Sequence, residues 1–306
     1  MNASYLIDNF TNPALLFFFL GLLAVRLKSD LRIPENSSKF ISLYLLFAIG
    51  FKGGQELSHS EWSMEIIYVL SAGVVLSLTV PIYTFFILKR KLSPANSGAI
   101  AAAYGSVSAV TFVTAVSYLE IQQISFGGHM VAVMALMEAP AIVVGVLLMN
   151  LFNNGQKSAL PFSDILKHAV TNGSVVLILG SLVIGFVASE EQAMGIAPFT
   201  TDIFKGFLAV FLLDMGITSG QKIKSLLKEG WFPFAFSILI PLINGCLTAV
   251  LSQFITDDIG NRFLLSILAA SASYIAVPAA MRLAAPTANP GLYIPMSLAI
   301  TFPFNI

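Results

Sequence analysis

Charged residues and cysteine are both scarce in this chain of 306 residues. Charged side chains make up 10% of the sequence and apolar ones 57%, whereas soluble domains contain about 25% charged residues. This composition excludes an ordinary soluble protein and indicates a chain that lies within a lipid bilayer. The one cysteine, Cys246, stands in an apolar segment, which excludes a disulfide framework and a cysteine-based metal cluster.

Two further absences limit what the chain can do and how its N-terminal segment is interpreted. The sequence contains no HExxH and no GxSxG pattern, so we expect it not to be an enzyme. Residues 1–12, before the first apolar run, contain no lysine or arginine. A cleaved signal peptide has basic residues there, so we expect this run to be a retained helix. The last apolar run stops at Ile306, and we expect the final crossing to be cut short.

Long apolar runs dominate what is present. With their flanks they are long enough to cross about 30 Å of hydrocarbon, and they predict an all-α integral membrane protein with ten transmembrane helices. The predicted helices lie near residues 10–27, 36–51, 63–88, 94–119, 129–152, 168–188, 200–219, 230–255, 261–285 and 290–306.

The basic residues indicate how these helices are oriented. Thirteen of the 16 lysines and arginines fall in alternate loops, such as Lys89-Arg90-Lys91, and the other loops contain only Lys52, Lys205 and Arg262. Loops that are rich in lysine and arginine stay in the cytoplasm. We therefore predict a multi-pass membrane protein with both termini outside and the basic loops in the cytoplasm.

Three patterns recur in the same order in the two halves of the chain. Gly50–Gln55 and Gly216–Gln221 both read G-x-x-x-G-Q, Ser106-x-Ser108 corresponds to Ser271-x-Ser273, and Pro140 corresponds to Pro303. They predict two five-helix repeats, residues 1–152 and 153–306. Because five is odd, the second repeat must run through the membrane inverted. For the glycine pattern, close helix packing is at least as good an interpretation as a ligand site.

The serine pairs interrupt the fourth and ninth predicted helices, at Gly105–Ser108 and Ser271–Tyr274. Paired interruptions at matching places in two repeats point to the binding site of a transporter. The second half of a broken helix presents N–H groups that attract anions, and the first half presents C=O groups that suit a hard cation such as Na⁺. Together with Thr111, these hydroxyls predict a small polar pocket. The alternative is that the serines only let helices pack closely.

Carboxylates inside a membrane helix are costly and indicate function. Glu138 stands in the fifth predicted helix before Pro140, and Asp214 stands in the seventh. Glu138 is interpreted as part of a cation site or as a proton carrier, with a buried structural acid as the alternative. A Na⁺ site near Ser108, Glu138, Ser273 and Asp214 is the resulting hypothesis.

These features resemble the cyanobacterial sodium-dependent bicarbonate transporters and their bacterial relatives. The matching stretches are Ile33-Pro34-Glu35, Gly53-Gly54, Tyr104-Gly105-Ser106-Val107-Ser108, Met137-Glu138-Ala139-Pro140-Ala141, Ala269-Ala270-Ser271-Ala272-Ser273, Pro286-Thr287-Ala288-Asn289-Pro290 and Tyr293-Ile294. The resemblance implies two inverted repeats with gate and core parts, crossed broken helices, and a homo-oligomer, with a trimer expected. It also implies bicarbonate bound with Na⁺ as coupling ion, no other cofactor, and a place in the bacterial inner (plasma) membrane.

The resemblance and the breaks together predict the binding residues. They are Gly105, Ser106, Val107, Ser108, Thr111, Glu138, Ser271, Ala272, Ser273 and Tyr274. Tyr274 stands where the family has an acid, and Glu138 stands where it favours aspartate. Some relatives also bind a PII-like regulator, but the central loop, Phe152–Lys167, is short here and disfavours one. We expect no nucleic-acid partner.

Three functional hypotheses remain open. The leading one is a secondary active transporter that couples Na⁺ to the uptake of a small anion such as bicarbonate. The second is a carrier for a different organic or inorganic anion, proton-coupled through Glu138. An intramembrane enzyme or a channel is the least favoured.

Overall fold

All regular structure in the computed structural model is helical over the residues that it describes, 12–60, 63–152, 163–164, 167 and 170–306. The helices are α2 (Pro13–Arg26), α3 (Glu35–His59), α4 (Met64–Leu88), α5 (Pro94–Gly105), α6 (Ala109–Ile121), α7 (His129–Phe152), α9 (Gly173–Val187), α10 (Glu190–Ala197), α11 (Phe204–Lys228), α12 (Trp231–Ser252), α13 (Ile259–Ala270), α14 (Ala276–Ala284), α15 (Pro290–Pro295) and α16 (Phe302–Asn305). Two π-helical turns, η1 (Pro198–Asp202) and η2 (Met296–Thr301), join α10 to α11 and α15 to α16.

Several of these helices begin at side-chain caps that the sequence encodes. Ser93 accepts a hydrogen bond from the third residue of α5, Asn172 caps α9, and Asp258 accepts from the backbone of Asn261 at 2.7 Å to begin α13. Such caps satisfy amides that have no partner inside the helix.

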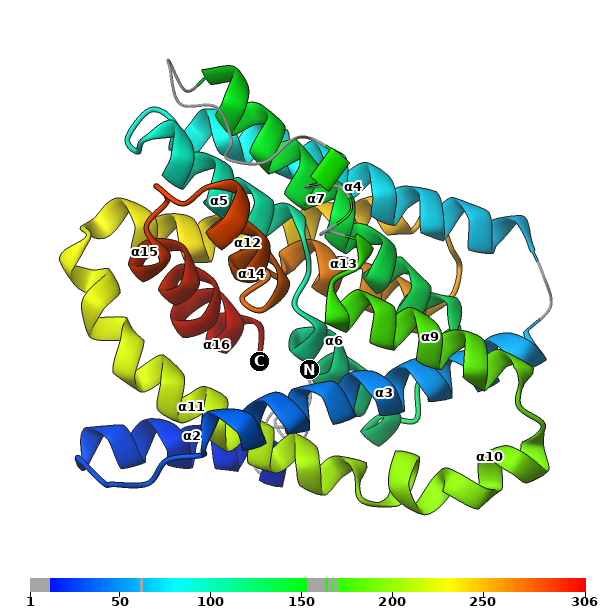
Figure 1. Ribbon diagram of the computed structural model, residues 1–306. Coiled ribbons are helices and arrows are strands. Elements are labelled where there is room, and N and C mark those ends of the chain that lie inside the picture. The colour runs from blue at the N-terminus through cyan, green and yellow to red at the C-terminus, as the bar shows by residue number, and fades with distance from the viewer. Residues whose placement is uncertain (1–11, 61–62, 153–162, 165–166, 168–169) are drawn as a thin grey trace.

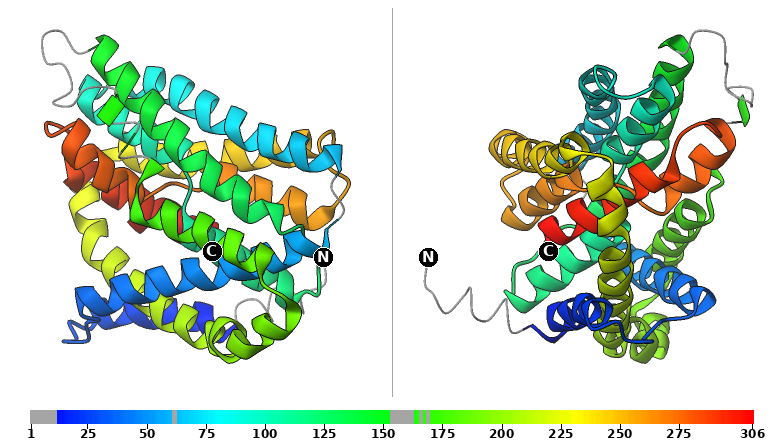
Figure 2. Two further views of the ribbon diagram at one scale, coloured as in Figure 1. Left: turned by 45° about the vertical axis from the view of Figure 1, so that its right-hand side comes forward. Right: turned by 90° about the vertical axis from the view of Figure 1, so that its left-hand side faces the viewer.

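The helices form two bundles, visible as the lower and upper parts of Figure 1 and of the left view of Figure 2. In the first bundle, α2 packs against α11 and α3 packs against α9. In the second bundle, α4, α5 and α7 pack on one another, and α12 packs on α13 and η2. Helix α6 contacts both α3 and α13 and so lies between the bundles.

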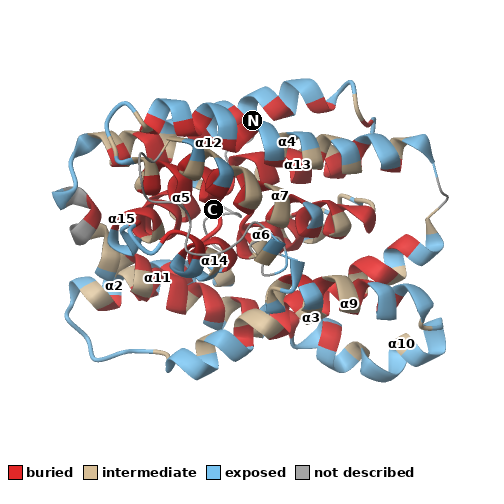
Figure 3. Ribbon diagram, turned by 45° about the horizontal axis from the view of Figure 1, so that its top comes forward, coloured by how far each residue is buried: buried red, intermediate tan, exposed pale blue. Residues whose placement is uncertain are grey.

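Burial distinguishes the helices that surround the breaks from those at the periphery (Figure 3). In α5 the side chains of Ala99, Ala101, Ala102 and Ala103 are fully buried, as expected of a helix that is apolar all round. Helix α12 instead exposes a row of aliphatic side chains that includes Leu239 and Val250. An exposed apolar face of this kind suits contact with lipid.

Within the part of the chain that the structure describes, five helical stretches are long and apolar enough to cross a membrane. They are Met64–Leu88, Pro94–Ile121, His129–Phe152, Glu190–Ile223 and Trp231–Ser252. Shorter apolar helices cover Pro13–Arg26, Gly173–Val187 and Ile259–Ala270. The chain is therefore a multi-pass helical protein, while ten crossings remain a prediction.

Three predicted boundaries were wrong. The seventh helix, expected to end at residue 219, continues as α11 to Lys228. The second helix, expected to end at residue 51, continues as α3 to His59 and contains the whole Gly50–Gln55 pattern. The polar segment at Glu190 and Glu191, expected to be a loop, is helix α10. There Ser189 and Gln192 form a reciprocal capping box, which starts a helix irrespective of polarity.

Candidate functional site

The first predicted break is present between α5 and α6. Helix α5 ends at Gly105, and Ser106 follows in an extended conformation with φ −82° and ψ −175°. A Cβ at Gly105 would lie 2.1 Å from Cγ of Pro81, so only glycine lets α5 approach α4 here. Ser108 then caps α6, because its Oγ accepts a hydrogen bond from the backbone N–H of Thr111 at 3.1 Å.

The second predicted break, between α13 and α14, has the same construction. Helix α13 ends at Ala270, and Ser271 follows with φ −83° and ψ 170°, almost the conformation of Ser106. The Oγ of Ser273 accepts a hydrogen bond from the backbone N–H of Val277, the second residue of α14, at 3.3 Å. In both breaks, the first serine ends one helix and the second serine lies at the start of the next.

The two breaks touch, although more than 160 residues separate them in the chain. The backbone N–H of Ser108 donates to Oγ of Ser271 at 3.0 Å, and the backbone N–H of Ser273 donates to the carbonyl of Ala103 at 2.8 Å. Backbone groups freed inside a membrane protein need partners within the protein. Each break thus provides a hydrogen-bond acceptor for a free backbone N–H group of the other break.

Two hydroxyls beside the breaks are buried without a hydrogen-bond partner among the described residues. They belong to Ser106 and Thr111. Leaving a buried hydroxyl unpaired costs about 1–3 kcal/mol. Their clustering around the crossing point therefore indicates that a polar ligand or ordered water completes the site.

A small cavity of about 30 Å³ lies at the crossing point. Its polar lining includes Ser108, Glu138, Ser273 and Tyr274, and its walls also include Val107. A water molecule occupies about 30 Å³ in the liquid, so the cavity has the dimensions of one small ion or molecule. Its lining contains one carboxylate and no basic side chain.

The other predicted site residues lie outside this lining. Ser271 acts on the cavity indirectly through its bond to Ser108, and Gly105 shapes the break, as described above. Ser106, Thr111 and Ala272 are buried beside the crossing point. Asp214, predicted to be near a Na⁺ site, does not line this cavity. Its carboxylate accepts a hydrogen bond from Ser38 at 2.5 Å in a second, larger cavity.

The larger cavity has a volume of about 970 Å³ and lies between the two bundles. The two cavities share five lining residues, so the large cavity leads to the crossing point. The shared residues are Leu46, Ala109, Ser174, Tyr274 and Ile275.

Sequence analysis missed Ser174, which carries a hydroxyl from the first bundle to the site. The segment Asn172-Gly173-Ser174 signals a helix start, since Asn172 accepts from the backbone N–H of Ser174 at 2.9 Å. The sequence around this helix start does not indicate that it lies beside the breaks in other helices.

Two crossed helix breaks that enclose a small polar cavity are typical of a secondary transporter. The chain belongs to the Na⁺-dependent bicarbonate transporter superfamily, whose family model matches residues 13–306. Membership confirms the predicted family and makes the chain a membrane transporter, not an enzyme. A search of curated proteins found no match.

Proposed function

We propose that the chain is a Na⁺-coupled symporter of a small oxyanion, with bicarbonate as the candidate substrate, and that both ligands bind where the two breaks cross. The observation that carries the proposal is the small cavity that joins Ser108 and Ser273 to the carboxylate of Glu138. It offers groups for an anion and for a cation side by side, and because its volume fits one small ion or molecule, the second ligand would lie where it opens into the larger cavity.

The anion would be held by groups at the starts of α6 and α14. The capping oxygens of Ser108 and Ser273 accept bonds from helix amides, which leaves each hydroxyl proton free to donate to an anion. The positive ends of two helix dipoles meet there as well. Because the cavity lining contains no lysine or arginine, the anion would be held weakly enough to be released during turnover.

The cation would be held by oxygen atoms on the other side of the cavity. Na⁺ prefers oxygen ligands, and the lining supplies the Glu138 carboxylate and serine hydroxyls. Among the described residues, Glu138 has no ion-pair partner. A bound cation would compensate a buried carboxylate that otherwise costs several kcal/mol to keep charged. Proton coupling through Glu138, with another anion as substrate, is the alternative.

An inverted repeat is supported by the packing. Under the predicted repeat, α2 corresponds to α9 and α3 corresponds to α11. The α2–α11 contact then maps onto the α9–α3 contact, and these are the two main pairs of the first bundle. We infer ten crossings with both termini outside. On that topology, the large cavity opens to the cytoplasm, because its charged lining includes Arg32 and Lys39 of a predicted cytoplasmic loop.

The family also suggests a homo-oligomer, with a trimer as the form that we propose. A PII-like regulator remains disfavoured. Its expected contact region falls largely on residues 153–162 and 165–166, which lie outside the described residues.

Uptake of radiolabelled bicarbonate into proteoliposomes tests the function. We expect an inward Na⁺ gradient to drive accumulation and a choline gradient of equal size not to. Ser108→Ala and Ser273→Ala each remove one donor, worth about 0.5–1.5 kcal/mol, and should weaken anion affinity up to about tenfold. Glu138→Gln should abolish the Na⁺ dependence.

The matched control is Ser77→Ala, which removes another buried serine hydroxyl. In the wild type this hydroxyl donates within α4 to the carbonyl of Val74 at 2.8 Å. We expect normal transport in this variant. Normal transport in the two break variants and in Glu138→Gln would refute the site. Na⁺-independent uptake that a proton gradient drives would instead favour the alternative carrier.

A further inference from the structure

The passage between the two cavities is bounded by the five residues that line both of them. Leu46 of α3 and Ser174 of α9 reach it from the first bundle. Ala109, Tyr274 and Ile275 reach it from the two breaks. Tyr274 has the largest side chain of the five, so its ring has the greatest effect on how wide the passage is.

The two breaks place corresponding residues at this passage. Ala109 follows the second serine of the first break, and Tyr274 follows the second serine of the second break. Alanine is compatible with this position, because α6 begins at Ala109 with its cap from Ser108. Forming a break therefore does not require a ring here. The ring of Tyr274 adds bulk to one side of the passage, and this bulk calls for another explanation.

The ring of Tyr274 is held in place by other rings. The residue is 9% exposed. Its ring centroid lies 5.6 Å from that of Phe302, with the planes at 66°, and the ring of Phe302 lies 5.9 Å from that of Phe18 on α2. Edge-to-face pairs at such distances are favourable. Because Phe18 belongs to the first bundle and Phe302 to the second, this row fixes Tyr274 while the bundles keep the present arrangement.

We propose that Tyr274 is a size-selecting gate, whose ring limits which anions pass from the large cavity to the small one. The proposal rests on the proposed function, in which the small cavity binds an oxyanion. The cavities measure about 970 Å³ and about 30 Å³, so the large one admits many anions that the site must reject. Bicarbonate passes beside the ring, whereas an anion that carries a larger group, such as an aromatic carboxylate, is stopped by it.

The reactivity of a cysteine behind the gate tests it without reference to transport. Ala135→Cys places a thiol in the small cavity, because Ala135 lines that cavity and not the large one. The exposed native cysteine is removed by Cys246→Ala. In detergent, sulfonatoethyl methanethiosulfonate, an anion larger than bicarbonate, should react slowly with this thiol. Adding Tyr274→Ala should raise the rate at least about tenfold, since a shielded group otherwise reacts only during local opening.

Matched variants separate the gate from a general loosening of the fold. Tyr274→Phe keeps the ring and should keep the slow rate. Tyr274→Leu lacks the ring but leaves less empty space than alanine, so it should raise the rate even if Tyr274→Ala folds poorly. Tyr44→Ala removes another buried tyrosine, which lines neither cavity, and should leave the rate slow.

A thiol in the large cavity provides the second control. Ser42 lines the large cavity and not the small one, so Ser42→Cys should react equally fast with and without Tyr274→Ala. Equal rates at Ala135→Cys with Tyr274 and with either ringless variant would overturn the proposal. A rise of the same size in Tyr274→Phe or Tyr44→Ala would overturn it as well.

Competition for uptake shows which proposal a failure concerns. Benzoate could place its carboxylate at the small cavity and its own ring in the space that Tyr274→Ala leaves. An excess of benzoate should therefore inhibit Na⁺-dependent bicarbonate uptake by Tyr274→Ala in proteoliposomes and not uptake by the wild type. Inhibition of both to the same degree would refute the gate. A wild type that takes up no bicarbonate would refute the proposed function alone, and the cysteine rates would then decide on the gate.

Discussion

Replacing Gly185 of α9 by alanine tests the contact between α9 and α3 in the first bundle. A Cβ at Gly185 would lie 2.1 Å from the carbonyl oxygen of Phe51 on α3, whereas ordinary contact begins near 3.4 Å. The helices would have to separate by about 1.3 Å, the difference between these distances. The clash is with backbone, so no side-chain rotation relieves it. Gln55, which donates to the carbonyls of Gly185 and Ala188, would be displaced as well.

A second glycine on the same helix provides the control. A Cβ at Gly180 would meet no atom within 4 Å, so Gly180→Ala should only gain helix propensity, worth up to about 1 kcal/mol. Overpacking at Gly185 costs about 1–3 kcal/mol. Both variants gain this propensity, so they should differ by the overpacking cost of about 1–3 kcal/mol, or roughly 2–5 °C in Tm for a chain of this size.

The assay is thermal unfolding of each purified variant in one detergent. Gly216→Ala and Gly206→Ala repeat the comparison on α11, where a Cβ at Gly216 would lie 2.1 Å from the carbonyl oxygen of Phe18 and one at Gly206 meets nothing. Equal Tm values within either pair would mean that these helices do not pack through their glycine faces.

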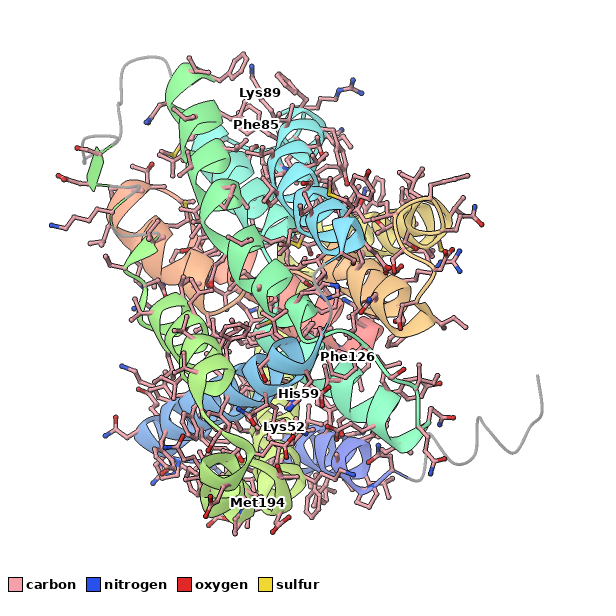
Figure 4. All side chains as sticks on the ribbon, turned by 90° about the vertical axis from the view of Figure 1, so that its right-hand side faces the viewer. Lys52, His59, Phe85, Lys89, Phe126 and Met194 are labelled. Carbon is pink, nitrogen blue, oxygen red and sulfur yellow. The ribbon has the colours of Figure 1, made fainter. Side chains whose placement is uncertain are left out.

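Two polar contacts on α3 lead to further expected outcomes (Figure 4). Lys52 pairs with Glu120 of α6 at 2.5 Å. An ion pair of this kind contributes about 1 kcal/mol, so Lys52→Gln should lower Tm by about 1–2 °C in a chain of this length. Exchanging the two charges should restore Tm in part, and an unchanged Tm in Lys52→Gln would contradict the pair. His59, at the exposed end of α3, has its pKa raised above 6.5 by hydrogen bonds to the Gln55 carbonyl and to Glu190. These bonds stabilise the protonated form of His59. The Tm difference between the wild type and His59→Gln should therefore be full below pH 6.5 and should decline as the pH rises through the higher pKa of the folded state. A Tm difference that grows with pH would refute this.

The breaks were predictable from the sequence because their cause is local. Glycine and serine pairs within apolar runs predicted interruptions at Gly105–Ser108 and Ser271–Tyr274, and α5 and α13 end there. Serine supplies both its own hydrogen-bonding group and a tolerance for extended backbone. The matching order in the two halves also predicted that the breaks belong to one site.

Features that depend on partners distant in the chain were not predictable. The polar end of α3 stays helical where the hydropathy pattern predicted a loop, and Gln55 is bonded to α9 there. The position of Ser174 at the small cavity depends on how α9 meets the second bundle. The glycine pattern, which left packing and ligand binding open, has Gly54 and Gly216 in helix contacts.

The two halves of the chain differ in a buried charge, and this difference affects how many cations could be coupled to each anion. If Pro140 corresponds to Pro303, the counterpart of Glu138 is Thr301. Glu138 lines the small cavity at the crossing point. The hydroxyl of Thr301 instead forms a hydrogen bond of 2.7 Å with the hydroxyl of Tyr104 in the second bundle. One carboxylate in a cavity of about 30 Å³ has room and charge for one cation.

Symport of one Na⁺ with one monovalent anion moves no net charge, so a membrane potential should not drive it. We therefore expect the Na⁺-dependent uptake rate to be the same whether a potassium diffusion potential in proteoliposomes is set to zero or to inside-negative. Acceleration by an inside-negative potential would show that more than one cation accompanies each anion. A second cation site would then have to lie away from Glu138, and the Asp214 carboxylate in the large cavity would be the first place to seek it.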